Sequence, residues 1–133
     1  MKKGIIIIFE KKDFDETNTL IFKSFFNQKI KICLVNNGNN NKNLQSLYKL
    51  KDSSKCDISI LSLKKEKKLI LAVKAGVRFL SQSENIKLII HTNPKNISNP
   101  KSIEKLLKVF EQEWLAKKEE RVLLRRVYSI SEF

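Results

Sequence analysis

Short apolar runs alternate along the chain with stretches whose apolar residues recur at helical spacing. Residues 4–9 (GIIIIF) form a continuous β-branched run, which is typical of a strand covered on both faces. Similar runs predict three further strands, over residues 30–35, 57–63 and 87–91. Helical periodicity predicts helices between them, over residues 13–28, 43–51 and 69–80. Strands alternating with helices imply right-handed crossovers. We therefore expect an α/β fold with a three-layer, mostly parallel sheet of about four strands and flanking helices.

Two details of this pattern predict local structure. Residues 52–54 (DSS) have the composition of a turn. The helix expected over residues 69–80 carries a face of small and apolar side chains that suits close packing on a sheet. That face comprises Leu69, Ala72, Val73, Ala75, Gly76 and Phe79.

The C-terminal part of the chain predicts a long helical segment. Ser102 can cap a helix whose apolar residues follow the i, i+3, i+4, i+7 rule as far as Trp114. Beyond residue 117 the pattern weakens to a second apolar cluster: Leu123, Leu124, Val127 and Tyr128. This tail is either a separate helix that folds back or an exposed apolar face that pairs with another chain. We expect one domain over residues 1–133, with a core over about 4–116 and a helical tail over about 117–133.

The composition fits a single globular domain of 133 residues with 41% hydrophobic and 31% charged residues. The longest apolar run, residues 5–9, is too short to span a bilayer, so we expect no transmembrane segment and a cytoplasmic location. The two cysteines, Cys33 and Cys56, lack metal-ligand spacing. Cys33 falls in a strand pattern, which predicts a reduced core residue.

The net charge of +13, from 27 basic and 14 acidic residues, favours anionic partners such as phosphates, nucleic acids or a membrane surface. Only four of the basic residues are arginine, and the lysines spread over every predicted element. The basic residues lack interleaved aromatic residues and a basic arm, which disfavours specific nucleic-acid binding. A charge-driven polyanion binder remains an alternative.

The strongest candidate for a binding site is the polar run that ends the second predicted strand. Asn36, Asn37 and Gly38 begin this run and Asn41 closes it, and both residue types tolerate unusual backbone conformations. In open α/β sheets the carboxyl edge is where ligands bind. A plain strand-to-helix turn is the alternative. His91, the only histidine, is expected to be structural, and the sequence contains no P-loop or G-x-G-x-x-G.

Three segments resemble motifs of glycosyltransferase family 2, whose enzymes have the GT-A fold. Residues 35–43 (VNNGNNNKN) lie where that family commonly has V-D-D-G-S-T-D-N-T. Residues 72–77 (AVKAGV) resemble its A-x-N-A-G-x helix. Residues 88–93 (LIIHTN), followed by 102–107 (SIEKLL), resemble its fourth strand, D-x-D motif and next helix. The chain is thus similar, over residues 4–110, to the N-terminal nucleotide-binding half of such an enzyme.

The resemblance implies a pocket for the nucleotide of a nucleotide sugar, with Asn36, Asn37, Gly38 and Asn41 as its contacts. Asn36 and Asn37 replace the family's two aspartates, and amides can bond a base edge but carry no charge. His91 and Asn93 stand at the D-x-D positions, a neutral pair that suits Mg²⁺ or Mn²⁺ poorly. Lys68 replaces a turn glycine. We further expect the acceptor half with its catalytic base to be absent, because the chain stops one helix after the fourth strand.

The sequence therefore predicts a degenerate nucleotide-sugar-binding or accessory domain, a pseudoenzyme with no catalytic residue, metal site or cofactor of its own. Lys65 and Lys68 are candidate phosphate contacts. The loop that holds them lies at the same carboxyl edge or at the opposite one, depending on where the third strand ends. The C-terminal segment is expected to make a homodimer or partner contact. One alternative is a minimal glycosyltransferase that uses a nucleotide sugar, with Mg²⁺ or Mn²⁺, together with a partner chain.

Overall fold

The computed structural model describes residues 2–10, 30–38, 41–53, 57–82, 86–93 and 126–129, together with residues 105, 108, 109 and 112. Seven elements lie within these ranges. In chain order they are β1 (Lys2–Phe9), β2 (Ile30–Asn36), α1 (Asn41–Ser53), β3 (Asp57–Ser62), α2 (Leu69–Leu80), β4 (Ile86–Thr92) and β5 (Arg126–Ser129).

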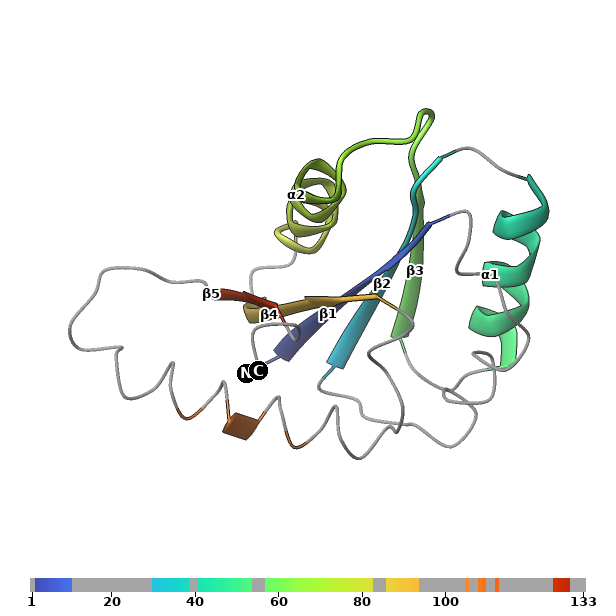
Figure 1. Ribbon diagram of the computed structural model, residues 1–133. Helices are drawn as coiled ribbons and strands as arrows, with labels where there is room; N and C mark the ends of the chain where they lie inside the picture. Colours follow the sequence, from blue (N-terminus) through green and yellow to red (C-terminus); the bar gives the residue numbers. More distant parts are fainter. Residues whose placement is uncertain are drawn as a thin grey trace.

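The strands form one sheet in the order β3-β2-β1-β4-β5, and every neighbouring pair is parallel (Figure 1). β1 lies at the centre, where Ile7 pairs with Leu34 of β2 and with Thr92 of β4. The α/β arrangement with a parallel sheet is confirmed. Within the described ranges the sheet has five strands, one more than the apolar runs indicate.

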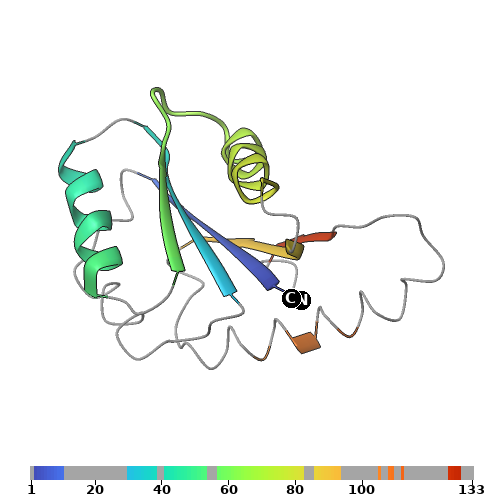
Figure 2. The same cartoon turned by 180° about the vertical axis from the view of Figure 1, so that it is seen from behind.

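The alternation of β1 side chains places apolar surface on both faces of the sheet. Ile5 and Ile7 belong to a buried cluster with Leu47 and Leu50 of α1. Ile6 and Ile8 face the other way, into a cluster with Ala72, Val73 and Leu80 of α2. The two helices therefore cover opposite faces, as Figures 1 and 2 show. Each fully buried isoleucine contributes roughly 2 kcal/mol through removal from water.

Helix α2 approaches the sheet closely at Gly76. A Cβ atom added at Gly76 would lie 2.9 Å from Cγ2 of Ile6. The buried residues of the helix are Ala72, Val73, Gly76 and Leu80. The predicted packing face is therefore correct at its centre but wrong at Leu69, which is 53% exposed. Leu69 is the first residue of the helix, just after the loop that follows β3.

Two other element boundaries differ from the expectation. The turn expected at residues 52–54 is wrong at Asp52 and Ser53, which belong to the last turn of α1. Residues 126–129 were expected to be helical, but they form strand β5. Val127 pairs with Ile89 and Tyr128 with Ile90 of β4. A short apolar cluster fits both periodicities, and here the open edge of β4 decides in favour of a strand.

Several expectations fall outside the described residues. The helix over 13–28, the tail residues Leu123 and Leu124, and Cys56 are among them. Lys105, Lys108, Val109 and Gln112 are helical, and the residues between them are not described, so the long helix expected after Ser102 stays a prediction. Within the described ranges, no helix is long and apolar enough to cross a membrane.

Cys33 is a free, fully buried thiol in β2, as the strand pattern predicts. Burial raises the pKa of the Cys33 thiol from 9.0 to about 12, and the nearby Lys31 charge opposes this shift. The ammonium of Lys31 itself lies 5.7 Å from the centre of the Phe79 ring.

We expect Cys33 to make the protein less stable at alkaline pH. The thiol keeps its proton in the folded chain up to about pH 12 but loses it above pH 9.0 in the unfolded chain. The unfolded state then binds fewer protons, so the free energy of unfolding falls as pH rises between these values. Denaturant titrations of Cys33→Ala and the parent, both carrying Cys56→Ser, measure this difference. Parallel pH profiles for the two would contradict it.

Candidate functional site

The carboxyl ends of β1, β2, β3 and β4 meet at one edge of the sheet, because all of these strands are parallel. From β1 the chain moves outward to β2 and β3, and then returns to β4 on the other side of β1. The direction of winding therefore reverses between β1 and β4. Open α/β sheets bind ligands outside the carboxyl ends of the strands, at such a point of reversal.

Asn37 joins this edge to the loop that follows β3. Its Oδ1 accepts a hydrogen bond from the backbone N–H of Lys67 at 2.9 Å. Its Nδ2 donates to the backbone carbonyl of the same residue, also at 2.9 Å. The side chain thus pairs with Lys67 as a neighbouring strand would. Asn37 is 4% exposed, and we refer to this pair of bonds as the Asn37 clamp.

Further bonds connect the strand ends. The Asn37 N–H donates to the carbonyl of Phe9 at the end of β1. The Leu63 N–H donates to the Asn36 carbonyl, and Asn36 Nδ2 donates to Ser62 Oγ at 3.2 Å. Asn36 is 1% exposed. Both amides that the sequence proposed as nucleotide contacts are therefore buried and bonded within the protein, and the first role that the geometry gives them is structural.

Gly38 brings the backbone past the same loop. Its φ of +112° is a conformation that side-chain-bearing residues rarely adopt. A Cβ added there would lie 3.8 Å from Cβ of Glu66, in ordinary contact. Gly38 is thus selected by its backbone conformation, and its neighbour in space is the loop after β3.

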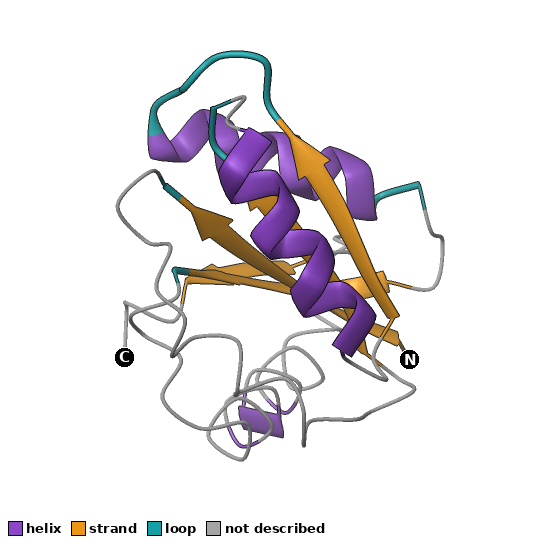
Figure 3. Cartoon of the chain, turned by 90° about the vertical axis from the view of Figure 1, so that its right-hand side faces the viewer, coloured by secondary structure: helices purple, strands orange, loops and turns teal. Residues whose placement is uncertain are grey.

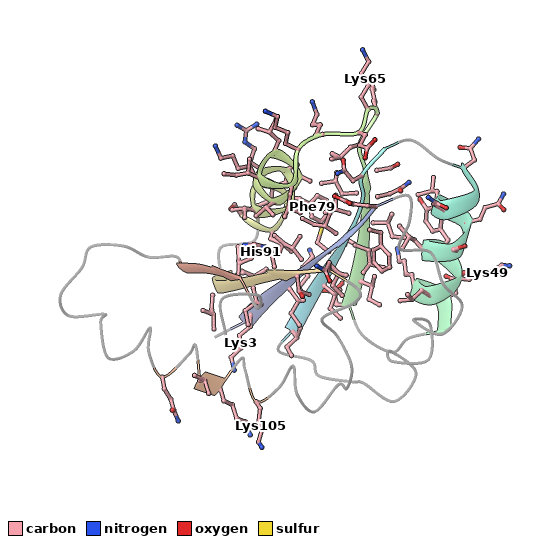
Figure 4. The ribbon with its side chains drawn as sticks, in the orientation of Figure 1. Lys3, Lys49, Lys65, Phe79, His91 and Lys105 are labelled. Carbon is pink, nitrogen blue, oxygen red and sulfur yellow. The ribbon has the colours of Figure 1, made fainter. Side chains whose placement is uncertain are left out.

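The position of the lysine-rich loop is now settled. β3 ends at Ser62, and the Asn37 clamp holds Lys67, so residues 63–68 lie at the carboxyl edge and not at the opposite one. The four lysines of this loop are exposed: Lys64, Lys65, Lys67 and Lys68. The loop extends beyond the strand end in Figure 3, and Figure 4 shows Lys65 at its tip, pointing away from the protein.

The second group of predicted site residues lies across β1 from the first. His91 is in β4, paired with Ile6, and is partly buried. Ile89 packs on the α2 side, so His91, two residues further along, faces that side too. Asn93 directly follows β4 and its carbonyl accepts a bond of 3.3 Å from Thr92 Oγ1. Two strand spacings, about 10 Å, separate β4 from β2.

The chemistry available at this edge is mostly basic and neutral, with two carboxylates, Glu10 directly after β1 and Glu66 in the loop after β3. Among the residues that the structure describes, no group of three or more His, Cys, Asp or Glu side chains could hold a metal ion. Asn41, the remaining predicted nucleotide contact, is exposed at the start of α1. The Asn37 clamp brings the backbone of Lys67, and with it the lysine-rich loop, next to the Asn36–Gly38 turn.

Comparisons of this chain with protein-family models, with curated proteins and with solved structures found no match. The roles that the resemblance implies for individual residues therefore stay predictions.

Sequence reasoning missed two features of this edge. The first is the Asn37 clamp, whose partner is a backbone group 30 residues away that no side-chain pattern could reveal. The second is the exposure of Leu69, Ile70 and Leu71. The four lysines directly before them were the available signal for the second feature, because a charged run marks the place where a buried face ends.

Proposed function

We propose that this chain is a nucleotide-binding accessory domain of the glycosyltransferase family 2 type, which binds a nucleotide or nucleotide sugar but does not transfer the sugar alone. The observation that carries the proposal is the Asn37 clamp. It fixes a loop with four exposed lysines and one glutamate at the carboxyl edge of a parallel α/β sheet. A diphosphate bound there would have cationic partners without a metal ion.

The exposure of the loop lysines and the burial of the amides support phosphate contacts at the loop better than base contacts at Asn36 and Asn37. Lys65 and Lys68 are exposed and free to reorient about flexible side chains. Asn37 keeps one N–H and one lone pair beyond the clamp, but its side chain is 4% exposed. We therefore propose Lys65 and Lys68 as the ligand contacts, and Asn37 as the residue that positions their loop.

The residue types at the resembling motifs support binding without autonomous catalysis. Asn36, Asn37, His91 and Asn93 stand where the family has carboxylates, and they supply no negative charge to a divalent cation. A minimal transferase completed by a partner chain is the second candidate. We do not propose a helical surface for a partner at residues 126–129, because these residues pair with β4 as a strand.

The test is a thermal-shift and calorimetry screen of the full chain against UDP, GDP, UDP-glucose and GDP-mannose, with and without Mn²⁺. Ligand at tenfold excess over Kd stabilises the native state by roughly 1.4 kcal/mol. We expect Lys65→Ala with Lys68→Ala to remove that shift. The matched control, Lys49→Ala with Lys51→Ala on α1, changes the charge equally and should keep it.

Each other outcome has a defined meaning. No shift at millimolar nucleotide would contradict the proposal. A shift lost equally in both double variants and abolished by salt would indicate general polyanion binding. Release of UDP from UDP-glucose only with Mn²⁺ would favour the transferase.

A further inference from the structure

Three consecutive aliphatic side chains at the start of α2 are exposed to solvent. Leu69 is 53% exposed, Ile70 62% and Leu71 45%. Further along the same helix, Ala72, Val73 and Leu80 are buried against the sheet. These three side chains therefore lie largely outside the core, although exposed aliphatic surface lowers the solubility of a protein.

These residues lie within a strongly basic stretch. Residues 64–78 contain six basic side chains and one acidic side chain, Glu66. Ile70, Lys74 and Arg78 follow one another at i+4 spacing and are all exposed, so they share the outer face of α2. We call the whole surface the basic–apolar patch, and its members are Lys64, Lys65, Lys67, Lys68, Leu69, Ile70, Leu71, Lys74 and Arg78.

The loop within the basic–apolar patch protrudes from the protein. The loop after β3 and the start of α2 form an outer edge of the molecule in Figures 1, 2 and 3, and Lys65 marks the tip in Figure 4. The loop is held in this position by the Asn37 clamp and by backbone bonds from Leu71 and Ala72 to the Lys68 carbonyl. The aliphatic side chains are thus presented on a fixed support.

We infer that the basic–apolar patch docks the protein onto an anionic lipid bilayer. Lysines near such a surface gain attraction from lipid headgroups, while neighbouring aliphatic side chains enter the boundary between headgroups and acyl chains. The lysine stems can lie along the apolar layer while their ammonium groups reach the headgroups. The patch shares Lys65 and Lys68 with the proposed nucleotide site. Its aliphatic members, Leu69, Ile70 and Leu71, have no part in that proposal, so variants at these positions test membrane docking separately.

Two other anionic partners fit the patch less well. Single-stranded nucleic acids stack their bases on aromatic side chains, and residues 64–78 contain none. An acidic helix would dock in an apolar groove, whereas the loop of this patch protrudes, with Lys65 at its tip (Figure 4). A bilayer accepts a protruding basic loop with exposed aliphatic side chains beside it, and its anionic headgroups are complementary to the six basic groups of the patch.

The first experiment is sedimentation of the full chain with two kinds of vesicle, without nucleotide. One is pure phosphatidylcholine and the other is equimolar phosphatidylcholine and phosphatidylserine. We expect binding to the anionic vesicles only. Lys64→Gln with Lys65→Gln should weaken it roughly 25-fold, about fivefold for each lysine. The matched control, Lys49→Gln with Lys51→Gln on α1, should bind as the parent does within about twofold.

The decisive variant leaves the charge unchanged. Leu69→Ser with Ile70→Ser should weaken vesicle binding by roughly tenfold or more, since two aliphatic side chains no longer enter the membrane. Tyr48→Ser, at a side chain 49% exposed on α1, is the control and should have no effect. Thermal melts check that each variant folds. A fluorophore on Ile70→Cys, in a Cys56→Ser background, should shift to the blue on anionic vesicles.

Three results would overturn the inference. They are absence of binding to anionic vesicles, full binding by Leu69→Ser with Ile70→Ser, and an unshifted fluorophore at position 70. Full binding by the apolar variant, together with equal affinity for single-stranded RNA, would mean that the lysines attract any polyanion.

Discussion

Replacing Gly76 with valine is expected to lower the free energy of unfolding by about 3 kcal/mol. A Cβ at this position would lie 2.9 Å from Cγ2 and 3.0 Å from Cδ1 of Ile6. Ile6 is fully buried in the central strand, so it has no room to retreat. Valine adds two further carbon atoms beyond that Cβ, and α2 must therefore move away from the sheet.

Chemical denaturation followed by circular dichroism measures this effect. Gly76→Ala separates the two contributions, since alanine gains about 1 kcal/mol in helix propensity and so offsets part of the clash. Lys74→Ala, at an exposed position two residues earlier, is the control and should stay within about 0.5 kcal/mol of the parent. A Gly76→Val protein as stable as the parent would mean that α2 does not pack on Ile6 as described.

Removing the Asn37 clamp is expected to lower the free energy of unfolding by about 2 kcal/mol. Asn37→Ala deletes two hydrogen bonds at once, and it leaves the N–H and carbonyl of Lys67 to find water. We expect the amide hydrogen of Lys67 to exchange at least about tenfold faster, because the loop can open without global unfolding. Hydrogen exchange with mass spectrometry, together with denaturant titration, measures both changes.

The control for this change is Gln45→Ala, which removes an exposed amide on α1 and should leave exchange in the loop unaltered. The same variant bears on function. If the clamp positions the phosphate contacts, then Asn37→Ala should also weaken nucleotide binding, although Asn37 itself need not touch the ligand. Protection of Lys67 unchanged in Asn37→Ala would show that other contacts hold the loop.

The sequence predicts most of the sheet and the course of α2, because these elements depend on local patterns. The four consecutive isoleucines of β1 are typical of a buried strand, and the predicted range of 69–80 agrees with α2. The remaining structure depends on pairing between segments that are distant in the sequence. Residues 126–129 become a strand only through β4, which precedes them by more than 30 residues.

The candidate site shows the same division. The sequence predicts that Asn36 and Asn37 lie at a carboxyl edge of the sheet, because they directly follow the apolar run of one strand. The sequence does not predict that their side chains are bonded within the protein. Their partners, Ser62 and Lys67, are distant in sequence and come close only when the chain folds. Helical periodicity places Leu69 on the packing face, but the side chain is exposed, because periodicity describes which side of a helix is apolar and not where the underlying sheet stops.

The pairing of β4 with β5 has a consequence for assembly of the chain. β5 is contributed by residues 126–129, so the outer edge of β4 stays open until this late segment arrives. An intermediate that lacks β5 exposes a row of unpaired backbone groups beside Leu88, Ile89 and Ile90, which is a template for strands of other molecules. The rate at which residues 126–129 find β4 therefore sets how long each new molecule is open to aggregation. Shortening the chain before residue 126 should lower the soluble yield more than it lowers helix content.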